Sequence, residues 1–160
     1  MEKNFNSPTK GKMDLDRVAK EIISYIQEEP DMKYQLIIGT DSEGNGKITL
    51  VTAIIIYRKK KGGRYFWRKV TQEKIFSLRQ KIYKEVEQSL LISQELLKKL
   101  KLYLVKEDIK SNLEIHIDVG ENGPTKELIR EVVGMVLGFG FRAKTKPASF
   151  GASMVADRHL

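Results

Sequence analysis

The sequence predicts an α/β fold: a mixed five-stranded sheet, in which three antiparallel strands precede two parallel ones, with helices on both faces. Three observations support this prediction. Short apolar, β-branched runs separated by turn signals fill the first half of the 160-residue chain. A long stretch with apolar residues three or four positions apart follows, which is the spacing of an amphipathic helix. The last part is a strand–helix–strand pattern, whose two strands should be parallel and joined by a right-handed crossover.

A polar lead-in and one helix are predicted before the sheet. Residues 1–12 are polar and contain Pro and Gly, which favours irregular, mobile structure. Asp14 or Asp16 is placed to cap a helix whose apolar residues between positions 18 and 26 recur at helical spacing. The helix is expected to end before Pro30, because proline rarely continues a helix.

Three strands joined by two tight turns are predicted next. The strands are expected over residues 35–41, over residues 48–57, and around residues 65–67. The turns are the small-residue cluster at 42–46, which contains Asn-Gly, and the Lys-Gly segment at 59–63. Short connections of this kind join antiparallel neighbours, so these strands should form a meander.

The second half of the chain is predicted to alternate helices and strands. The expected elements are a helix of about six turns over 78–100, a strand over 113–119, a helix from Gly123 to Gly138 or Gly140, a strand over 139–144 and a final helix over 147–157. We interpret residues 34–160 as one domain, preceded by the lead-in and helix of residues 1–33.

Composition excludes several function classes. The chain has no cysteine, so disulfides, zinc–thiolate sites and thiol nucleophiles are excluded. The N-terminus lacks an apolar signal core, and no stretch approaches the ~20 apolar residues that span a bilayer. We therefore expect a soluble cytoplasmic protein with no membrane partner.

The charge of the chain indicates a polyanionic partner. The net charge is +8, from 29 basic and 21 acidic side chains. A basic surface attracts polyanions, among which nucleic acid is the commonest, although many basic proteins bind none. Charge alone therefore leaves open whether this surface binds nucleic acid or is only solvated.

Three aspartates stand where elements end. Asp41 closes the first apolar strand, Asp118 closes the fourth strand, and Asp157 lies in the last turn of the terminal helix. Carboxylates at the ends of adjacent strands are suitable ligands for hard cations such as Mg²⁺, which takes oxygen ligands in near-octahedral geometry. The pattern favours metal-assisted phosphate chemistry.

Each aspartate also has a purely structural interpretation. Asp41 resembles a turn initiator before the Asn-Gly turn, and Asp118 an Asx-turn before Gly120. Asp157 is three residues from the chain end, where helices fray, although it shares a helical face with Phe150 on which an unpaired carboxylate is costly. Sequence position alone leaves these alternatives open.

Four motifs carry a resemblance to a known family. They are Ile38-Gly39-Thr40-Asp41-Ser42, His116-Ile117-Asp118-Val119-Gly120, Gly123-Pro124-Thr125-Lys126, and Lys146-Pro147 through Ala156-Asp157. Their order, and the order of the elements around them, resemble the ribonuclease H-like fold over roughly residues 34–160. More closely, the chain is similar to a small bacterial family of predicted ribonuclease H-like proteins of unproven activity.

The resemblance implies a metal-dependent nuclease that hydrolyses phosphodiester bonds of nucleic acid with two Mg²⁺ or Mn²⁺ ions. The implied catalytic residues and metal ligands are Asp41, Glu85, Asp118 and Asp157, with Asp41 as the bridging ligand. Glu85 is chosen for the long helix because it lies on the shoulder of the apolar stripe in the first two turns. Glu87 lies farther from the stripe and is the second choice, and Glu95 points to the opposite side.

Basic residues are the candidate contacts to nucleic acid. Five of the seven residues from position 58 to 64 are basic, and three aromatic residues follow them. The predicted nucleic-acid-binding residues are Arg58, Lys59, Lys60, Lys61, Arg64, Lys146 and Arg158. A solvated hairpin tip is the alternative for the first five. His116 shares a strand face with Asp118, but a lone histidine on a strand is usually only hydrogen-bonded, so we do not assign it to the site.

Two other functions remain as alternatives. The first is a non-catalytic nucleic-acid-binding module on the same fold, whose binding would survive Asp41→Asn. The second rests on residues 118–125, which resemble the phosphate loop of sugar-kinase and actin-like ATPases. Those proteins close two such domains around ATP, and 160 residues supply only one. The substrate, the cleavage polarity and the oligomeric state are not determined by the sequence.

Overall fold

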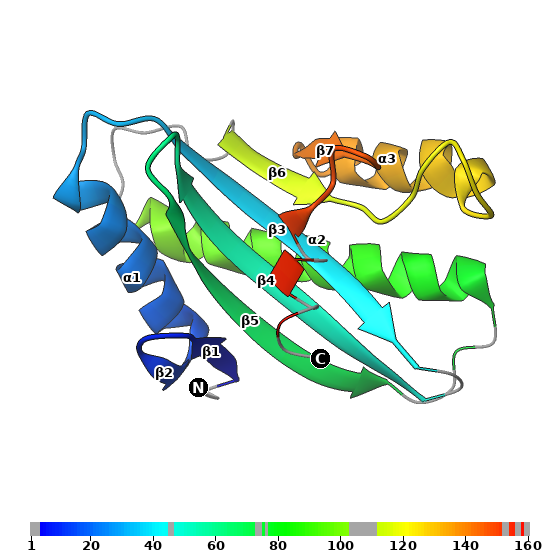
Figure 1. The fold of residues 1–160 in the computed structure, drawn as a ribbon, viewed down its shortest axis with the longest axis horizontal. Helices are drawn as coiled ribbons and strands as arrows, with labels where there is room; N and C mark the ends of the chain where they lie inside the picture. The colour runs from blue at the N-terminus through cyan, green and yellow to red at the C-terminus, as the bar shows by residue number, and fades with distance from the viewer. Residues whose placement is uncertain are drawn as a thin grey trace.

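The protein is a mixed α/β structure built on one seven-stranded sheet (Figure 1). This computed structural model describes residues 4–44, 47–72, 75, 77–102, 112–151, 154–155 and 158. The elements are β1 (Phe5–Ser7), β2 (Gly11–Met13), α1 (Leu15–Glu28), β3 (Tyr34–Glu43), β4 (Ile48–Arg58), β5 (Gly63–Gln72), α2 (Leu78–Lys101), β6 (Leu113–His116), the 3-10 helix η2 (Lys126–Leu128), α3 (Ile129–Gly138) and β7 (Arg142–Lys144).

The sheet has the predicted mixed topology. Its strand order is β2-β1-β5-β4-β3-β6-β7. Strands β3, β4 and β5 pair antiparallel as a meander, while β6 pairs parallel to β3 and β7 parallel to β6. The predicted fold class is therefore confirmed, although the predicted count of five strands was wrong.

The two additional strands come from the segment predicted to be a polar lead-in. Strands β1 and β2 form a hairpin, and β1 pairs with β5 through Asn6 and Trp67. Phe5 and Met13 are only 1% and 4% exposed, so the hairpin adds to the core. Each strand has three residues, which is too short for a period-of-two pattern to stand out against the surrounding polar residues.

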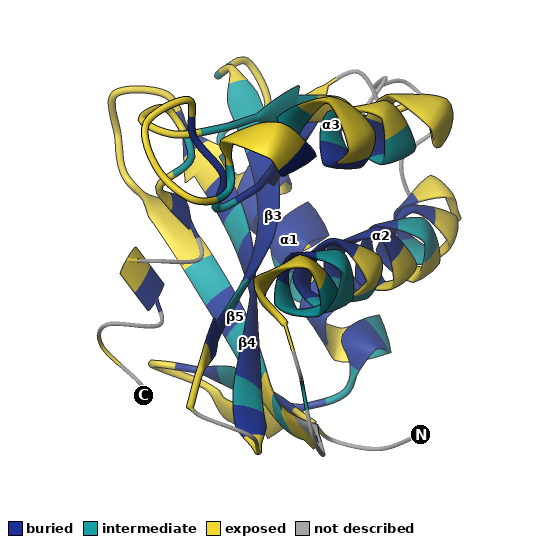
Figure 2. Ribbon diagram, turned by 90° about the vertical axis from the view of Figure 1, so that its right-hand side faces the viewer, coloured by how far each residue is buried: buried dark blue, intermediate teal, exposed yellow. Residues whose placement is uncertain are grey.

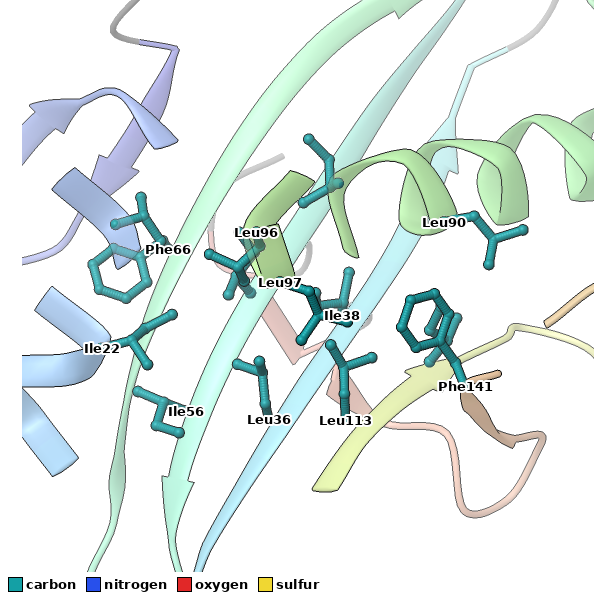
Figure 3. Packing of buried hydrophobic residues seen from close by; sticks show 14 of the residues in the cluster. Ile22, Leu36, Ile38, Ile56, Phe66, Leu90, Leu96, Leu97, Leu113 and Phe141 are labelled. Carbon is teal, nitrogen blue, oxygen red and sulfur yellow. The ribbon is translucent and has the colours of Figure 1, made fainter. Parts of the chain in front are cut away.

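Helices α1, α2 and α3 cover one face of the sheet, and their buried residues face it (Figure 2). Strand residues alternate between the two faces of the sheet, so Leu36 and Ile38 of β3 and Ile56 of β4 point to the helix-covered face. There they form one core cluster with residues of the helices, such as Leu96 of α2 (Figure 3). Asp14 is the N-cap of α1, because its carboxylate accepts the Arg17 backbone N–H at 2.8 Å.

The C-terminal segment lies on the opposite face (Figures 1 and 2). Residues 151, 154, 155 and 158 are helical, whereas residues 146–148 form a turn, so the helical part begins later than the predicted residue 147. Gly151 lies against the sheet, where an added Cβ would come within 2.8 Å of Ile37. The prediction of helices on both faces is confirmed.

The ends of the parallel strands are less regular than predicted. β6 stops at His116 and β7 begins at Arg142, but backbone hydrogen bonds continue beyond them. Ile117 donates to Lys144 at 2.9 Å, and Lys146 donates to Val119 at 2.8 Å. The segments that follow β6 and β7 therefore stay side by side up to the residues around Asp118.

None of the helices in the described part of the chain combines the length and apolar character needed to cross a bilayer.

Truncating the core should destabilise the fold strongly. Leu96 is 0% exposed, so Leu96→Ala should lower the free energy of unfolding by about 2–5 kcal/mol, because it removes apolar contacts and leaves a cavity. Leu91, on the same helix but 48% exposed, is the matched control, and Leu91→Ala should change stability by no more than ~0.5 kcal/mol. Chemical denaturation measures both values. Equal losses in the two variants would contradict the assignment of this core.

Candidate functional site

Asp41 and Asp118 are brought level by the parallel pairing of β3 and β6. Gly39 is the register partner of His116. Asp41 follows two residues later within β3, and Asp118 follows two residues later just beyond the end of β6. Asp41 lies inside β3, which continues to Glu43, so it does not begin the turn. Its carboxylate accepts the Ser42 backbone N–H at 2.9 Å. Both aspartates are half-buried.

Glu85 reaches the end of β3 from α2. Its side chain is only 4% exposed and accepts a hydrogen bond from the Ser42 hydroxyl. A second polar contact between the same elements joins Thr40 Oγ1 to Ser89 Oγ at 2.8 Å, one turn further along α2. These two contacts hold the helix on the strand in the position that brings Glu85 to the strand end.

The three carboxylates interact through their charges. Burial raises the pKa of Glu85 and the charges of Asp41 and Asp118 act in the same direction, while the Ser42 hydrogen bond and Lys81 oppose the shift, which leaves the pKa at about 8. These charges act strongly on Glu85 because its side chain is buried and little water screens it. Glu87, the second choice for the helix ligand, is instead exposed and pairs with Lys84 at 3.7 Å.

Lys146 places its ammonium among these acids. Its Nζ lies 2.8 Å from Asp118 Oδ1. The hydrogen bond and the charge of Asp118 raise the pKa of Lys146, and the charges of Asp41 and Glu85 act in the same direction. The sequence selected Lys146 only as a contact to nucleic acid, and the structure shows that it is also the counter-ion of Asp118.

His116 ties the C-terminal segment to the sheet. It is 5% exposed, and its Nδ1 accepts the backbone N–H groups of Phe150 at 3.2 Å and Gly151 at 3.1 Å. Nε2 lies 3.3 Å from Glu114 Oε1, so the ring carries its proton on Nε2. Burial lowers the pKa of His116, which keeps the ring neutral. The anchoring role was missed because it depends on a contact with residues 34 and 35 positions away.

Of the two predicted site residues near the chain end, Asp157 and Arg158, only Arg158 is among the described residues. Asp157 lies outside the described residues. Arg158 is described, helical and exposed.

The basic tip of the β4–β5 hairpin does not meet the acids. Arg58 pairs with Tyr34 at the start of β3, whereas Val51 pairs with Asp41. Seven residues of strand separate these two positions along β3, which corresponds to ~23 Å. The structure therefore brings Lys146 to the cluster and leaves the tip at the other end of the sheet.

Arg58 belongs to the fold and not to the exposed tip. It is 8% exposed, its Nη2 donates to the Tyr25 carbonyl at 2.7 Å, and its Nη1 pairs with Glu29 at 2.8 Å. Its guanidinium also lies 3.9 Å from the centre of the Tyr25 ring. We remove it from the candidate nucleic-acid contacts, because its donors are used by the fold. Lys59, Lys60, Lys61 and Arg64 are exposed.

The donors of the cluster suit a hard cation. Asp41, Glu85 and Asp118 offer carboxylate oxygens, and a divalent ion would relieve the repulsion between them. Among the described residues, no group of three or more acidic, histidine or cysteine side chains stands at the spacing that holds one ion. Lys146 and the Ser42 hydroxyl are bonded to two of the three carboxylates.

Comparisons with known proteins agree with the fold. The model of a family described as "Ribonuclease H-like" matches residues 17–160. An uncharacterized protein of Bacillus subtilis (strain 168), YkuK, is 31% identical over 163 residues, which covers 96% of this chain and 95% of the relative. No solved structure matches the chain significantly.

The burial of Glu85 predicts a loss of stability as pH rises. The folded protein holds a proton on Glu85 up to a pKa of about 8, whereas the unfolded chain releases it near 4.5. Between these values the folded state binds more protons, so the free energy of unfolding falls as pH rises. Glu85→Gln removes this contribution and should stabilise the metal-free protein more at pH 9 than at pH 5, with a difference on the order of a few kcal/mol.

Denaturation curves in chelator-treated buffer at the two pH values measure this difference. Glu87→Gln, an exposed substitution on the same helix, should change the free energy of unfolding by the same amount at pH 5 and at pH 9. A Glu85→Gln effect that is independent of pH would contradict the raised pKa.

Removing the acceptor on His116 should release the C-terminal segment. In His116→Leu the N–H groups of Phe150 and Gly151 lose their partner, so their amide hydrogen exchange should accelerate roughly tenfold or more. His116→Asn places an amide oxygen near the position of Nδ1 and should retain most of the protection. Exchange measured by NMR tests both variants, and protection that persists in the Leu variant would show that another contact holds the segment.

Proposed function

The chain belongs to the ribonuclease H-like family, and on that premise we propose that it is a metal-dependent nuclease that hydrolyses phosphodiester bonds of nucleic acid. This proposal is supported by the position of Asp41 near the end of β3, the hydrogen bond between Glu85 and the neighbouring Ser42, and the position of Asp118 just beyond the end of β6, which pairs with β3. Carboxylates near the ends of adjacent strands favour a role in binding a cation.

Mg²⁺ or Mn²⁺ is the proposed cofactor. Asp41, Glu85 and Asp118 would hold it, with Asp157 expected from the sequence as a further ligand. A divalent ion bound there supplies an activated water and neutralises charge on the reacting phosphate.

The chain's own groups prepare this site. The Ser42 hydroxyl orients the Glu85 carboxylate, and the Ser42 backbone N–H orients that of Asp41. Lys146 holds a positive charge beside Asp118, where a phosphate can approach from solvent because its side chain is 55% exposed. In the hydrolysis, a water oxygen bonds to phosphorus as the bond to the leaving ester oxygen breaks.

Nucleic acid is the proposed partner, and its contacts extend beyond the acids. Lys59, Lys60 and Lys61 follow Arg58, which lies ~23 Å from Asp41 along the strand, and Arg64 lies level with Leu36, ~17 Å from Asp41. A duplex that touches both places would cover about seven base pairs at ~3.4 Å each. Arg158 is a further candidate contact on the C-terminal segment.

Cleavage assays test the proposal directly. Labelled RNA–DNA hybrid, duplex, single-stranded and junction substrates are incubated with Mg²⁺ or Mn²⁺. The wild type should cut at least one of them, and Asp118→Asn and Asp41→Asn should reduce the rate roughly 10²-fold or more while largely preserving binding. Glu87→Gln is the matched acidic control and should cut at the wild-type rate.

Other results of binding and melting experiments would favour one of the two alternative functions. Salt-dependent binding without cleavage of any substrate, unaffected by Asp41→Asn, would indicate a non-catalytic binding module. A rise in melting temperature with ATP would indicate a nucleotide-phosphate-binding protein.

A further inference from the structure

We propose that a hollow between α1, the β1–β2 turn and the start of β5 binds an unpaired nucleobase. The inference rests on the proposed function in taking nucleic acid as the partner, and it adds that strands with unpaired bases are the preferred class. The hollow measures about 440 Å³, within the ~300–1,000 Å³ usual for ligand sites. Its lining comes from elements that lie side by side at one end of the molecule (Figure 1).

The β1–β2 hairpin closes one side of the hollow. Its turn, residues 8–10, is held by the Ser7 hydroxyl, which accepts the backbone N–H of Thr9 at 3.4 Å and that of Lys10 at 3.2 Å. The hairpin pairs with β5 farther along that strand, so residues 63–66 of β5 line the hollow beside the turn. The segment that looked like a polar lead-in thus builds a wall of this site.

Arg64 and Tyr25 supply a flat platform in the hollow. The Arg64 guanidinium lies over the Tyr25 ring, 4.9 Å from its centre. The Tyr34 ring packs edge-on against Tyr25, with ring centres 6.0 Å apart, and helps to fix the platform. Tyr25 is 4% exposed whereas Arg64 is exposed, so the guanidinium is the part that a ligand reaches. Unpaired bases stack on guanidinium planes as well as on aromatic rings.

The charges around the hollow suit a neutral ring better than a phosphate. Its charged lining residues are two cations, Lys10 and Arg64, and two acids, Glu21 and Glu28, so their charges cancel. A phosphate placed there would be repelled by both carboxylates. A base carries no charge, and the amino group of cytosine, adenine or guanine can donate to a carboxylate oxygen. The hollow should therefore prefer bases with an amino group over thymine.

Basic residues on both sides of the hollow can hold the phosphates of the same strand. The exposed tip lysines, residues 59–61, directly precede the part of β5 that lines it. On the other side, a second hollow shares Lys10 and is also lined by Lys12 and Arg17. Asp14 is its one acidic lining residue, so positive charge predominates there and suits a phosphate.

The hollow lies away from Asp41. Arg64 is level with Leu36, ~17 Å along the strand from Asp41. Base binding can therefore be measured in chelator, without a metal ion and without cleavage. A failure of this inference is then distinguishable from a failure of the nuclease proposal, which the cleavage assay tests.

Fluorescence anisotropy with three matched, labelled strands tests the inference. The strands are a short oligo(deoxycytidine), an oligo(thymidine) of the same length, and an abasic strand with the same number of phosphates. Each is titrated with the full-length protein in chelator at constant salt, because phosphate contacts depend on salt.

Two variants and one control are compared with the wild type. Arg64→Lys keeps the positive charge and removes the planar group. Ser24→Phe places a ring in the hollow without changing its charge, since Ser24 is an exposed lining residue. Arg130→Lys makes the first substitution at an exposed position of α3 and is the matched control.

We expect the wild type to bind oligo(deoxycytidine) roughly tenfold more tightly than the abasic strand, because stacking adds to the phosphate contacts. Oligo(thymidine) should fall between the two, since thymine lacks the amino group. Arg64→Lys and Ser24→Phe should each remove most of the difference between oligo(deoxycytidine) and the abasic strand, while affinity for the abasic strand stays close to the wild-type value. Arg130→Lys should behave as the wild type does.

Four results would contradict the inference. Equal wild-type affinities for oligo(deoxycytidine) and the abasic strand would show that only phosphates are bound, and would leave the nuclease proposal intact. A preference for bases that persists in both Arg64→Lys and Ser24→Phe would place base binding elsewhere. Oligo(thymidine) binding as tightly as oligo(deoxycytidine) would contradict the role of the two glutamates. No binding of any strand would overturn the site, whatever the cleavage assay finds.

Discussion

The hydrogen bond between Ser42 and the buried carboxylate of Glu85 is the interaction on which the site depends. It joins the end of β3 to the first turns of α2 across the boundary between sheet and helix layer. Without a donor, a carboxylate that is only 4% exposed would be strongly unfavourable. With it, α2 is held on β3, and Glu85 lies beside Ser42, the residue that follows Asp41.

The second constraint is the parallel pairing of β3 with β6. A shift of one residue in this register would turn Asp118 to the helix-covered face, while Asp41 stayed on the other. His116 supports the arrangement on that face, because its Nδ1 binds the first residues of the C-terminal segment. The Lys146 ammonium then offsets part of the repulsion that the pairing creates.

Much of the fold was predictable from local pattern. Asp14 and the apolar spacing identified α1, and the β-branched runs identified β3 and β4. Strands β1 and β2 were missed, since three residues carry almost no periodic signal. Arg58 was selected as a contact to nucleic acid because it begins a run of basic residues, but its side chain is only 8% exposed. Its burial depends on Tyr25 and Glu29, which lie on α1 and just beyond it.

The sequence by itself determined the fold class and the family, because these follow from periodicity, turn residues and short motifs. Only the tertiary structure decided which groups meet. It placed Glu85 and not Glu87 beside Ser42, set Lys146 on Asp118, and moved the basic tip to the far end of the sheet. Those outcomes depend on strand register and helix docking, which bring together residues far apart in the chain through contacts that no local pattern contains.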